Sequence, residues 1–286
     1  MDPLVSVIIP TYNRETLIRK AIDSVLAQTY RQWEIVVVDD GSEDNTKDVV
    51  LSYKNENIFY IYQENRGIAA ARNTGIKNSR GSFIAFLDSD DYWRPNKLEK
   101  QMKLFFEHPE YGMVASQCAS IRTDGTFRKR NRRGKSGWVL EDLFKANFIR
   151  TSSAIVKREC LDKVGLFDET LKEGEEYDLW LRIASKYPIG FVNEPLAVYV
   201  DNPYGVSTDS LVGRLYRLQL LQKTYLKEKI PKKVYTKRIA NTCHYIGRHY
   251  LKRGEKRSGQ DYLRKACMLD PFNLKNLLYY VYSYIL

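Results

Sequence analysis

Three aspartates within four residues are the side chains of this sequence most able to do chemistry. Asp88, Asp90 and Asp91 follow an apolar run, residues 82–87, that cannot solvate charged groups. Their carboxylates repel one another unless a cation or hydrogen-bond donors compensate them. A hard divalent cation that bridges to a diphosphate would do so. A helix N-cap explains one or two of these aspartates but not Asp88, which we expect to point from a strand end into the same crevice.

Polar residues also follow three earlier apolar runs. They are residues 10–13 (PTYN), 39–42 (DDGS) and 64–67 (ENRG). A single Asp-Gly-Ser is usually a turn and a helix cap. In open α/β sheets, however, ligands bind at the carboxyl ends of the strands. Four polar strand ends in succession therefore predict one binding crevice along an edge of the sheet.

The spacing of apolar residues predicts the elements that would position these side chains. Short β-branched runs alternate with amphipathic stretches, which is typical of βαβ units around a mostly parallel sheet. The predicted strands are residues 5–9, 33–38, 58–62, 82–87, 111–119, 153–156, 189–192 and 196–200. The predicted helices are residues 14–28, 45–53, 68–78 and 96–107, one that starts at 157, and 175–186. The fold class is therefore α/β.

Beyond residue 208 no strand pattern remains and long helical patterns follow. We predict an α/β domain over residues 1–207 and a basic, all-helical appendage over residues 208–286. One unit of a helical repeat cannot bury its own faces, so we expect this region to pack on the α/β body. Its spacing resembles a partial tetratricopeptide helix pair, through Ile246, Gly247, Tyr250, Gly254, Ala266 and Pro271.

The charge is divided in the same way. The chain has 46 Lys and Arg against 35 Asp and Glu, a net +11. Residues 214–286 carry 17 basic and 4 acidic side chains, a net +13, which leaves 29 basic and 31 acidic side chains, a net −2, in residues 1–213. Helices rich in Lys, Arg, Leu and Tyr can lie on anionic lipid. We therefore predict that the basic tail contacts an anionic membrane surface, with a solvated basic surface as the alternative.

Cysteine usage and the chain ends bear on the compartment. The four cysteines, spread between residues 118 and 267, show no CxxC spacing, which is typical of neither a zinc site nor a dense disulfide framework. The first residues show no signal-peptide pattern, and the apolar run 277–286 is half as long as a membrane span. We expect a cytoplasmic protein that meets any membrane from its cytosolic face.

Four segments carry a family resemblance. They are residues 5–14 (VSVIIPTYNR), 36–46 (VVVDDGSEDNT), 65–75 (NRGIAAARNTG) and 86–93 (FLDSDDYW). In this order, over residues 4–200, they resemble the successive motifs of the family 2 glycosyltransferases. The resemblance implies the GT-A fold, a Rossmann-like and mostly parallel sheet flanked by helices, and an enzyme that uses a nucleotide-diphospho-sugar.

The resemblance also implies a role for each matching residue. Tyr12 falls where the family packs the nucleobase, and Asp40 where a carboxylate reads the imide N–H of the base. Arg72 is placed to meet ribose or phosphate, and Asp88 lies toward the ribose and the sugar. The other residues expected to bind the nucleotide sugar are Pro10, Arg14 and Ser89.

A divalent metal, Mn²⁺ or Mg²⁺, is part of the same resemblance. Asp90 matches the second aspartate of the family's Asp-x-Asp motif, which holds the ion on the diphosphate. Asp91 is a substitute ligand or a helper. The physics agrees, because a departing diphosphate builds negative charge that a metal ion stabilises.

The acidic pair in residues 174–182 (GEEYDLWLR) resembles the family segment that supplies the catalytic base. Glu176 falls at the position of the usual aspartate, and this departure leaves open whether Glu176 or Glu175 deprotonates the acceptor hydroxyl. Exposed acids at a helix N-terminus are the alternative. With one base and no carboxylate nucleophile placed by the motifs, the implied reaction is a single displacement with inversion.

The resemblance thus implies an inverting hexosyltransferase that uses a nucleotide-diphosphate donor, with UDP-sugars first. The implied acceptor is a hydroxyl of a saccharide or lipid-linked acceptor in cell-surface polysaccharide biosynthesis. Residues 138–147 and 150–153 lie where the family shapes its acceptor pocket, and they do not identify the acceptor. Residues 200–207 lack a histidine that many relatives carry, so its metal or diphosphate contact is not carried over.

Two other functions fit parts of the sequence. A nucleotidyltransferase of sugar phosphates also uses carboxylates and a metal, but it should show a glycine-rich phosphate loop, and residues 11–14 contain no glycine. A nucleic-acid-binding protein would use the basic tail, but it should show an aromatic and basic groove or a recognition helix. The acidic first part of the chain disfavours nucleic acid as a partner.

Overall fold

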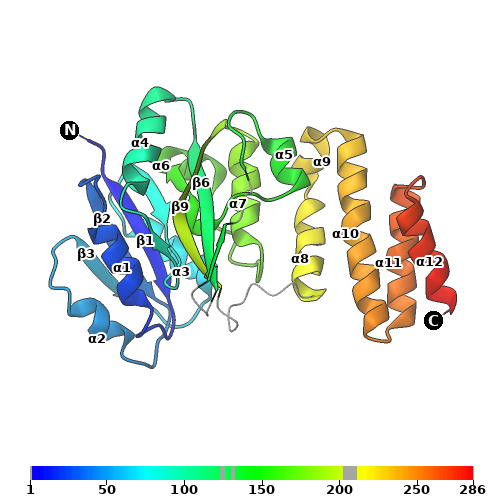
Figure 1. Cartoon of the computed structure of the whole chain (residues 1–286), viewed down its shortest axis with the longest axis horizontal. Coiled ribbons are helices and arrows are strands. Elements are labelled where there is room, and N and C mark those ends of the chain that lie inside the picture. The colour runs from blue at the N-terminus through cyan, green and yellow to red at the C-terminus, as the bar shows by residue number, and fades with distance from the viewer. Residues whose placement is uncertain (1, 123–125, 130–132, 202–210, 286) are drawn as a thin grey trace. The chain divides into compact units, whose positions relative to one another are not determined.

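The computed structural model describes residues 2–122, 126–129, 133–201 and 211–285 (Figure 1). The chain divides into two units. The first comprises residues 1–139, 148–170 and 175–205, and the second comprises residues 140–147, 171–174 and 206–286. The predicted domain boundary at residue 207 lies outside the described residues.

The described strands of the first unit form one nine-stranded sheet, in the order β3-β2-β1-β4-β8-β6-β9-β5, with β7 paired to β6. The parallel half consists of β3 (Ile58–Tyr62), β2 (Trp33–Asp39), β1 (Val5–Thr11) and β4 (Phe83–Phe86). The other strands are β8 (Ile155–Lys157), β6 (Met113–Arg122), β9 (Ile189–Asp201), β5 (Tyr92–Trp93) and β7 (Phe127–Lys129). The predicted mostly parallel α/β sheet is confirmed.

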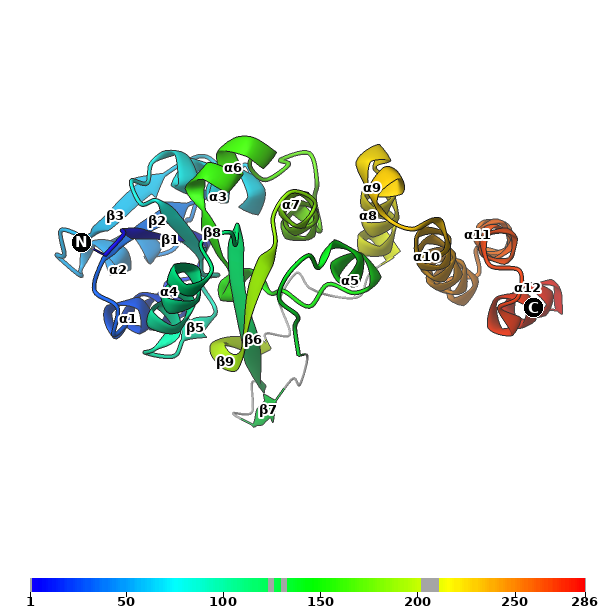
Figure 2. The ribbon, with the colours of Figure 1, turned by 90° about the horizontal axis from the view of Figure 1, so that it is seen from above.

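Helices cover both faces of this sheet (Figure 2). One face carries α1 (Ile18–Leu26) and α4 (Lys97–Glu107), and the other carries α3 (Ile68–Lys77) and α6 (Arg158–Val164). Alternate residues of β1 pack into a core shared with α1 and α4, whereas Ile8 faces α3. A Cβ on Gly75 of α3 would lie 2.4 Å from Ile8 Cγ2, so the glycine permits this close approach. Because both faces are covered, the strands are nearly continuous apolar runs.

The carboxyl ends of the parallel strands lie side by side. Thr11 is opposite Asp39 in the β1–β2 register, and Asp39 is opposite Tyr62 in the β2–β3 register. The backbone continues this pairing, since the Asp40 amide donates to the Thr11 carbonyl at 2.8 Å. The polar strand ends are therefore brought to one edge of the sheet, as the sequence predicts.

Three further elements complete the first unit, and some bounds differ from the sequence prediction. These elements are α2 (Thr46–Leu51), the 3₁₀ helix η1 (Thr151–Ser153) and α7 (Glu175–Ala184). β9 is one strand where two were predicted, because its pairing with β6 continues through register shifts on both sides of Gln117. η1 occupies the start of a predicted strand, and α1 begins at Ile18 because residues 14–17 form a turn.

The second unit is helical. Its helices are α5 (Leu140–Lys145), α8 (Leu211–Leu221), α9 (Thr224–Lys229), α10 (Lys232–Lys252), α11 (Lys256–Leu269) and α12 (Leu274–Ile285). The tetratricopeptide-like spacing falls on α10, α11 and the turns that follow them. The two helices pack closely, since a Cβ on Gly247 would lie 2.9 Å from the Gly259 carbonyl oxygen. Across the described residues, none of the helices combines the length and the apolar character that a membrane span requires.

Candidate active site

The aspartate-rich turn after β4 is anchored by Asp91. The Asp91 amide donates to the Asp88 carbonyl at 2.9 Å, which closes the turn. The Asp91 side chain is buried, and its carboxylate accepts hydrogen bonds from the Ser152 hydroxyl (2.5 Å) and the Val200 amide (3.2 Å). Burial, and then the charge of Asp88, raise the pKa of Asp91 well above its usual range. Asp91 therefore ties the turn to η1 and β9.

Ser152 is a site residue that the sequence analysis did not single out. In addition to its bond to Asp91, its hydroxyl oxygen accepts a hydrogen bond from the Asp88 amide at 3.2 Å. Its carbonyl accepts the indole N–H of Trp93 at 2.7 Å. Ser152 lies 61 residues after Asp91, so local spacing carries no signal for the pair. The sequence places it in the polar run 151–153 ahead of an apolar strand, within residues 150–153 that match the acceptor region of the family, but not beside the aspartates.

Asp88 and Asp90 are the aspartates of the turn that remain partly exposed. Burial and the charge of Asp88 raise the pKa of Asp90, while Arg14 opposes the shift. Burial disfavours the charged form of Asp90, and the nearby Asp88 carboxylate repels it, so a bound cation would favour the ionised form of Asp90. Within the described part of the chain, no three His, Cys, Asp or Glu side chains gather into a metal cage. The turn therefore fits Mg²⁺ or Mn²⁺ as a partial site that diphosphate oxygens would complete.

A buried arginine joins this turn to α7. Arg72, in α3, donates from Nη2 to Asp88 Oδ1 at 2.8 Å and from Nη1 to Glu175 Oε1 at 2.7 Å. Burial acts to lower the pKa of Arg72, but the two carboxylates outweigh burial and the net shift is upward. The two bonds use two of its five N–H donors, and Nε has no hydrogen-bond partner among the described residues, so Arg72 can keep both carboxylates and still donate to another group.

The acidic pair begins α7, and its two members differ. Glu175 is buried and pairs with Arg72. Glu176 is partly exposed, and burial followed by the charge of Glu175 raises its pKa to about 7. A carboxylate of this pKa exchanges protons near neutrality, as a general base should. The structure thus distinguishes two residues that the sequence leaves equivalent.

Asp40, at the end of β2, organises the loop after β3. Its carboxylate accepts hydrogen bonds from the Gly67 amide (2.8 Å), the Arg66 amide (2.9 Å) and Gln63 Nε2 (2.7 Å). Gly67 has a φ of 89°, in the left-handed region that favours glycine. One of the three bonds reaches Oδ2, and a carboxylate oxygen can accept two. Asp40 thus combines a loop-fixing role with capacity for one more donor.

The turn after β1 and the aspartate-rich turn hold the other predicted nucleotide-binding residues. Tyr12 is 44% exposed and directly follows β1, whereas Pro10 is buried within that strand. Arg14 is partly exposed, and Ser89 is buried. The structure brings all four to the edge that carries Asp40 and the aspartates. Tyr12 and Arg14 are the members whose exposed side chains can reach a ligand.

Lys97 is an unexpected buried charge beneath the site. It is fully buried at the start of α4, and its ammonium lies 3.9 Å from the centre of the Trp93 ring. Within the described residues its Nζ has no hydrogen-bond partner. Burial lowers the pKa of Lys97 to about 7. Lys97 thus supports Trp93, which in turn bonds to Ser152.

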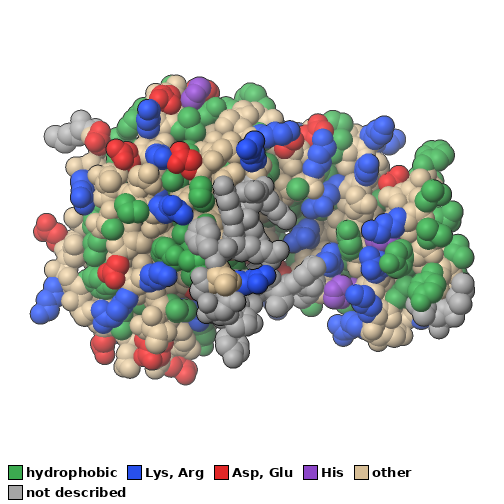
Figure 3. Space-filling model, viewed as in Figure 1, with side chains coloured by type: hydrophobic (Ala, Val, Ile, Leu, Met, Phe, Trp, Pro, Cys, Tyr) green, Lys and Arg blue, Asp and Glu red, His purple; other side chains and the backbone are tan. Residues whose placement is uncertain are grey.

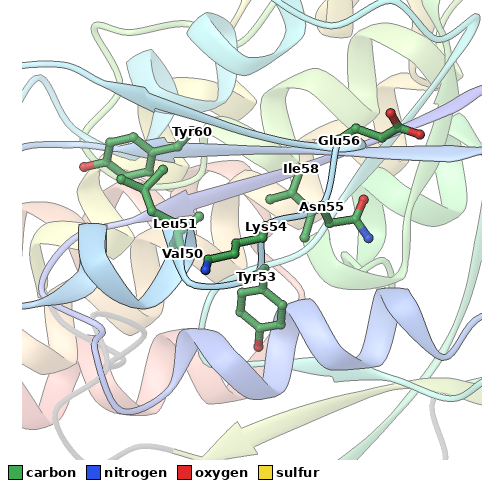
Figure 4. A pocket seen from close by; sticks show the side chains of 8 residues that line it. All are labelled: Val50, Leu51, Tyr53, Lys54, Asn55, Glu56, Ile58 and Tyr60. Atoms are coloured by element: carbon green, nitrogen blue, oxygen red, sulfur yellow. The ribbon is translucent and has the colours of Figure 1, made fainter.

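A shallow hollow lies elsewhere in the first unit, between α2 and β3 (Figure 4). It has a volume of about 350 Å³, and its lining includes Val50, Tyr53, Ile58 and Tyr60. None of the residues predicted for the site lines it. We therefore place the candidate site at the edge that carries the carboxylates and not in this hollow.

The sequence matches a known family. A family model described as "Glycosyl transferase family 2" matches residues 6–165, which is more than half of the chain. The chain therefore belongs to glycosyl transferase family 2, and its fold is of the GT-A type. The match favours glycosyl transfer over nucleotidyl transfer and over nucleic-acid binding.

Two curated relatives illustrate the similarity. WfgD of Escherichia coli, a UDP-Glc:alpha-D-GlcNAc-diphosphoundecaprenol beta-1,3-glucosyltransferase, is 49% identical over 217 residues, which cover 76% of this chain and 82% of WfgD. An uncharacterized glycosyltransferase of Rickettsia typhi is 38% identical over 199 residues, which cover 65% of this chain. The chain spans 61% of the length of the Rickettsia protein.

Solved structures share the fold. Residues 1–349 of Staphylococcus aureus TarS in complex with UDP-GlcNAc match with a TM-score of 0.72 at 18% identity, over 98% of this chain and 90% of TarS. The mannosyltransferase PcManGT from Pyrobaculum calidifontis, in complex with GDP-Man and Mn²⁺, matches with a TM-score of 0.65 at 22% identity, over 100% of this chain and 81% of PcManGT. At these identities the likeness shows the fold alone.

Replacing Lys97 tests the buried charge. We expect Lys97→Met to raise the free energy of unfolding at pH 7 by about 1–3 kcal/mol, because it removes a buried polar group without a hydrogen bond. The folded pKa of about 7 lies below the ordinary value of 10.5, so the unfolded state binds more protons between these values. Wild-type stability should therefore rise with pH across this window, and the gain from Lys97→Met should shrink.

Urea unfolding at pH 7 and pH 9.5 measures both effects. Lys103→Met, in the same helix at an exposed lysine, is the matched control and should change neither stability nor its pH dependence. A destabilising Lys97→Met with a constant offset at the two pH values would contradict this account of Lys97.

Proposed function

We propose that the protein is an inverting, metal-dependent glycosyltransferase that moves a hexose from a UDP-sugar to a hydroxyl of a saccharide or lipid-linked acceptor. The main support for the proposal is the pair of hydrogen bonds that Arg72 makes. It bonds Asp88, in the turn expected to face the leaving diphosphate, and Glu175, beside the candidate base. The two sides of a transfer site, for the leaving group and for the acceptor, are thus held by one buried guanidinium.

The donor end of the site is assigned to the first two strand ends. Tyr12 would stack on the nucleobase, and Asp40 Oδ2 would accept the imide N–H of uracil. Both residues lie at the same sheet edge, and the Tyr12 ring is available for such a contact. WfgD is named for UDP-Glc, and TarS is known in complex with UDP-GlcNAc. The name of WfgD therefore supports a UDP-hexose as the donor, and TarS is an example of this fold with a UDP-sugar bound.

Asp90 would hold Mg²⁺ or Mn²⁺ together with the diphosphate, and Asp88 would lie toward the ribose and the sugar. When bound, the ion supplies positive charge that stabilises the departing diphosphate. Asp91 would hold the aspartate-rich turn in place, because its carboxylate is bonded to Ser152 and to the Val200 amide. The presence of Mn²⁺ with GDP-Man in PcManGT supports a metal in this fold.

Glu176 is the proposed base. Its carboxylate would take the proton of the acceptor hydroxyl while the hydroxyl oxygen attacks the anomeric carbon from the side opposite the diphosphate. The bond between the anomeric carbon and the diphosphate oxygen breaks, and an α-linked donor yields a β-linked product. Glu175 would position the start of α7 through Arg72. The beta linkage in the name of WfgD is consistent with inversion.

The acceptor is proposed from the 49% identical relative. The name of WfgD specifies a GlcNAc-diphosphoundecaprenol acceptor, which is a lipid-linked saccharide. We infer an acceptor of the same class for this protein, within cell-surface polysaccharide biosynthesis. Such an acceptor would place the enzyme in the cytoplasm, at the cytosolic face of the membrane.

Donor binding gives the most direct test. With Mn²⁺, UDP-glucose at about 100 times its Kd should stabilise the wild type by about 2.7 kcal/mol, which a thermal-shift assay detects as a rise of several degrees. Asp90→Ala should abolish this shift, because it removes the proposed metal ligand. Asp162→Ala, at an exposed aspartate of α6, is the matched control and should retain it. A metal-independent shift that survives Asp90→Ala would contradict the metal assignment.

The base is tested by rate and pH together. Glu176→Gln should lower kcat by about 10²- to 10⁴-fold and spare UDP binding, because the amide cannot take a proton. Wild-type kcat should fall as pH drops below about 7, where Glu176 becomes protonated. Steady-state assays between pH 5.5 and 8.5 measure both.

Glu175→Gln separates the two glutamates. It weakens the pair with Arg72, so it should lower the melting temperature. It also removes a charge that raises the pKa of Glu176, so the pH dependence should remain while its midpoint moves below 7. If Glu176→Gln retains a near-normal rate and Glu175→Gln loses the pH dependence, Glu175 is the base.

A further inference from the structure

The last helix exposes an apolar stripe. Leu274, Leu277, Leu278, Val281 and Tyr282 of α12 are spaced at i, i+3, i+4, i+7 and i+8, and their exposed fractions run from 47% to 74%. A stripe with this spacing normally faces a protein core. In α12 it faces outward over the whole described length of the helix.

The opposite face of α12 buries polar side chains. Asn276 and Ser283 are 1% and 0% exposed. Asn276 Nδ2 donates to the Ala266 carbonyl at 3.4 Å, and Gln260 Nε2 donates to the Ser283 carbonyl at 3.1 Å, so both contacts reach α11. Because these hydrogen bonds orient α12 on α11, the outward direction of the apolar stripe follows from specific contacts.

Two further exposed apolar side chains lie near the start of α12. Met268, in the last turn of α11, and Phe272, between α11 and α12, are 77% and 94% exposed and enlarge the apolar area at this end of the second unit. In Figure 3, hydrophobic side chains gather over α11 and α12, with Lys and Arg among them. An exposed apolar patch of this kind, rimmed by polar residues, marks an interaction surface.

The charge around the stripe selects its partner. The helices α11 and α12 together carry five basic side chains and one acidic side chain, Asp261. Exposed basic residues lie on the same two helices, among them Lys256, Arg264, Lys265 and Lys275. A second copy of the chain would bring two strongly positive units together, which disfavours self-association. An anionic lipid surface attracts the basic residues and accepts the apolar ones.

We propose that the exposed face of α12, extended by Met268 and Phe272, docks on an anionic lipid bilayer. The apolar stripe enters the boundary between headgroups and acyl chains, and the lysines and arginines of α11 and α12 contact lipid phosphates. The docking would hold the enzyme beside a lipid-linked acceptor. In this respect the inference rests on the proposed function. It does not depend on the chemistry at Asp90 or Glu176.

Vesicle binding by the full chain tests the docking face. The probes are vesicles of phosphatidylcholine alone and of phosphatidylcholine with 30% phosphatidylglycerol, and the readout is cosedimentation. The test variant is Leu277→Glu with Val281→Glu, at two exposed positions of the stripe. Leu51→Glu with Phe106→Glu changes the same charge at two exposed apolar positions of the first unit and is the matched control.

The wild type and the control should bind the anionic vesicles, and the α12 variant should lose at least tenfold in partitioning. Unchanged binding of the α12 variant, or equal wild-type binding to both vesicles, would overturn the proposal. A wild-type dimer in light scattering that the α12 variant converts to a monomer, without a change in vesicle binding, would assign the face to a second copy. The UDP-glucose thermal shift, run on the same variants, reports separately on folding and on the donor site.

Discussion

The candidate site depends on one buried cation. Arg72 cannot lose its proton, so its burial requires opposite charge within hydrogen-bonding distance. Asp88 and Glu175 provide that charge, and they come from the end of β4 and the start of α7. Removing one partner would leave the guanidinium with a single carboxylate and with a buried N–H donor that lacks an acceptor, which typically costs about 1–3 kcal/mol. The guanidinium therefore fixes the geometry of the aspartate-rich turn relative to the acidic pair.

A second buried cation under the same turn follows a different rule. Lys97 lies against the Trp93 ring, and burial lowers its pKa to about 7. It can therefore lose its proton and become neutral, whereas Arg72 needs carboxylate partners. Above it, Trp93 holds Ser152, and Ser152 holds Asp91. The turn is thus supported by one permanently charged side chain with two partners and by one amine whose charge is adjustable, which matches the different chemistry of arginine and lysine.

The sequence alone predicts the parallel strands and the polar residues at their ends, because burial on both faces and strand termination are local patterns. It does not predict the pairs that shape the site. Arg72 and Glu175 are 103 residues apart, and Ser152 and Asp91 are 61 apart, so each pair exists only through the fold. Which glutamate can act as the base depends on which of them is paired with Arg72. The sequence does not predict the burial of Lys97, because a lysine near the start of a helix is usually exposed to solvent.

The amphipathic pattern of α12 shows a further limit of sequence reasoning. Periodicity identifies an apolar stripe, but it does not say whether protein, lipid or water lies against it. Here the hydrogen bond from Asn276 to the Ala266 carbonyl and the one from Gln260 to the Ser283 carbonyl hold the polar face against α11. If the apolar stripe faced the protein core, these hydrogen bonds could not form. They form as observed when the stripe faces outward, where lipid can cover it. The same net positive charge that would repel a second copy then becomes the attraction to anionic lipid.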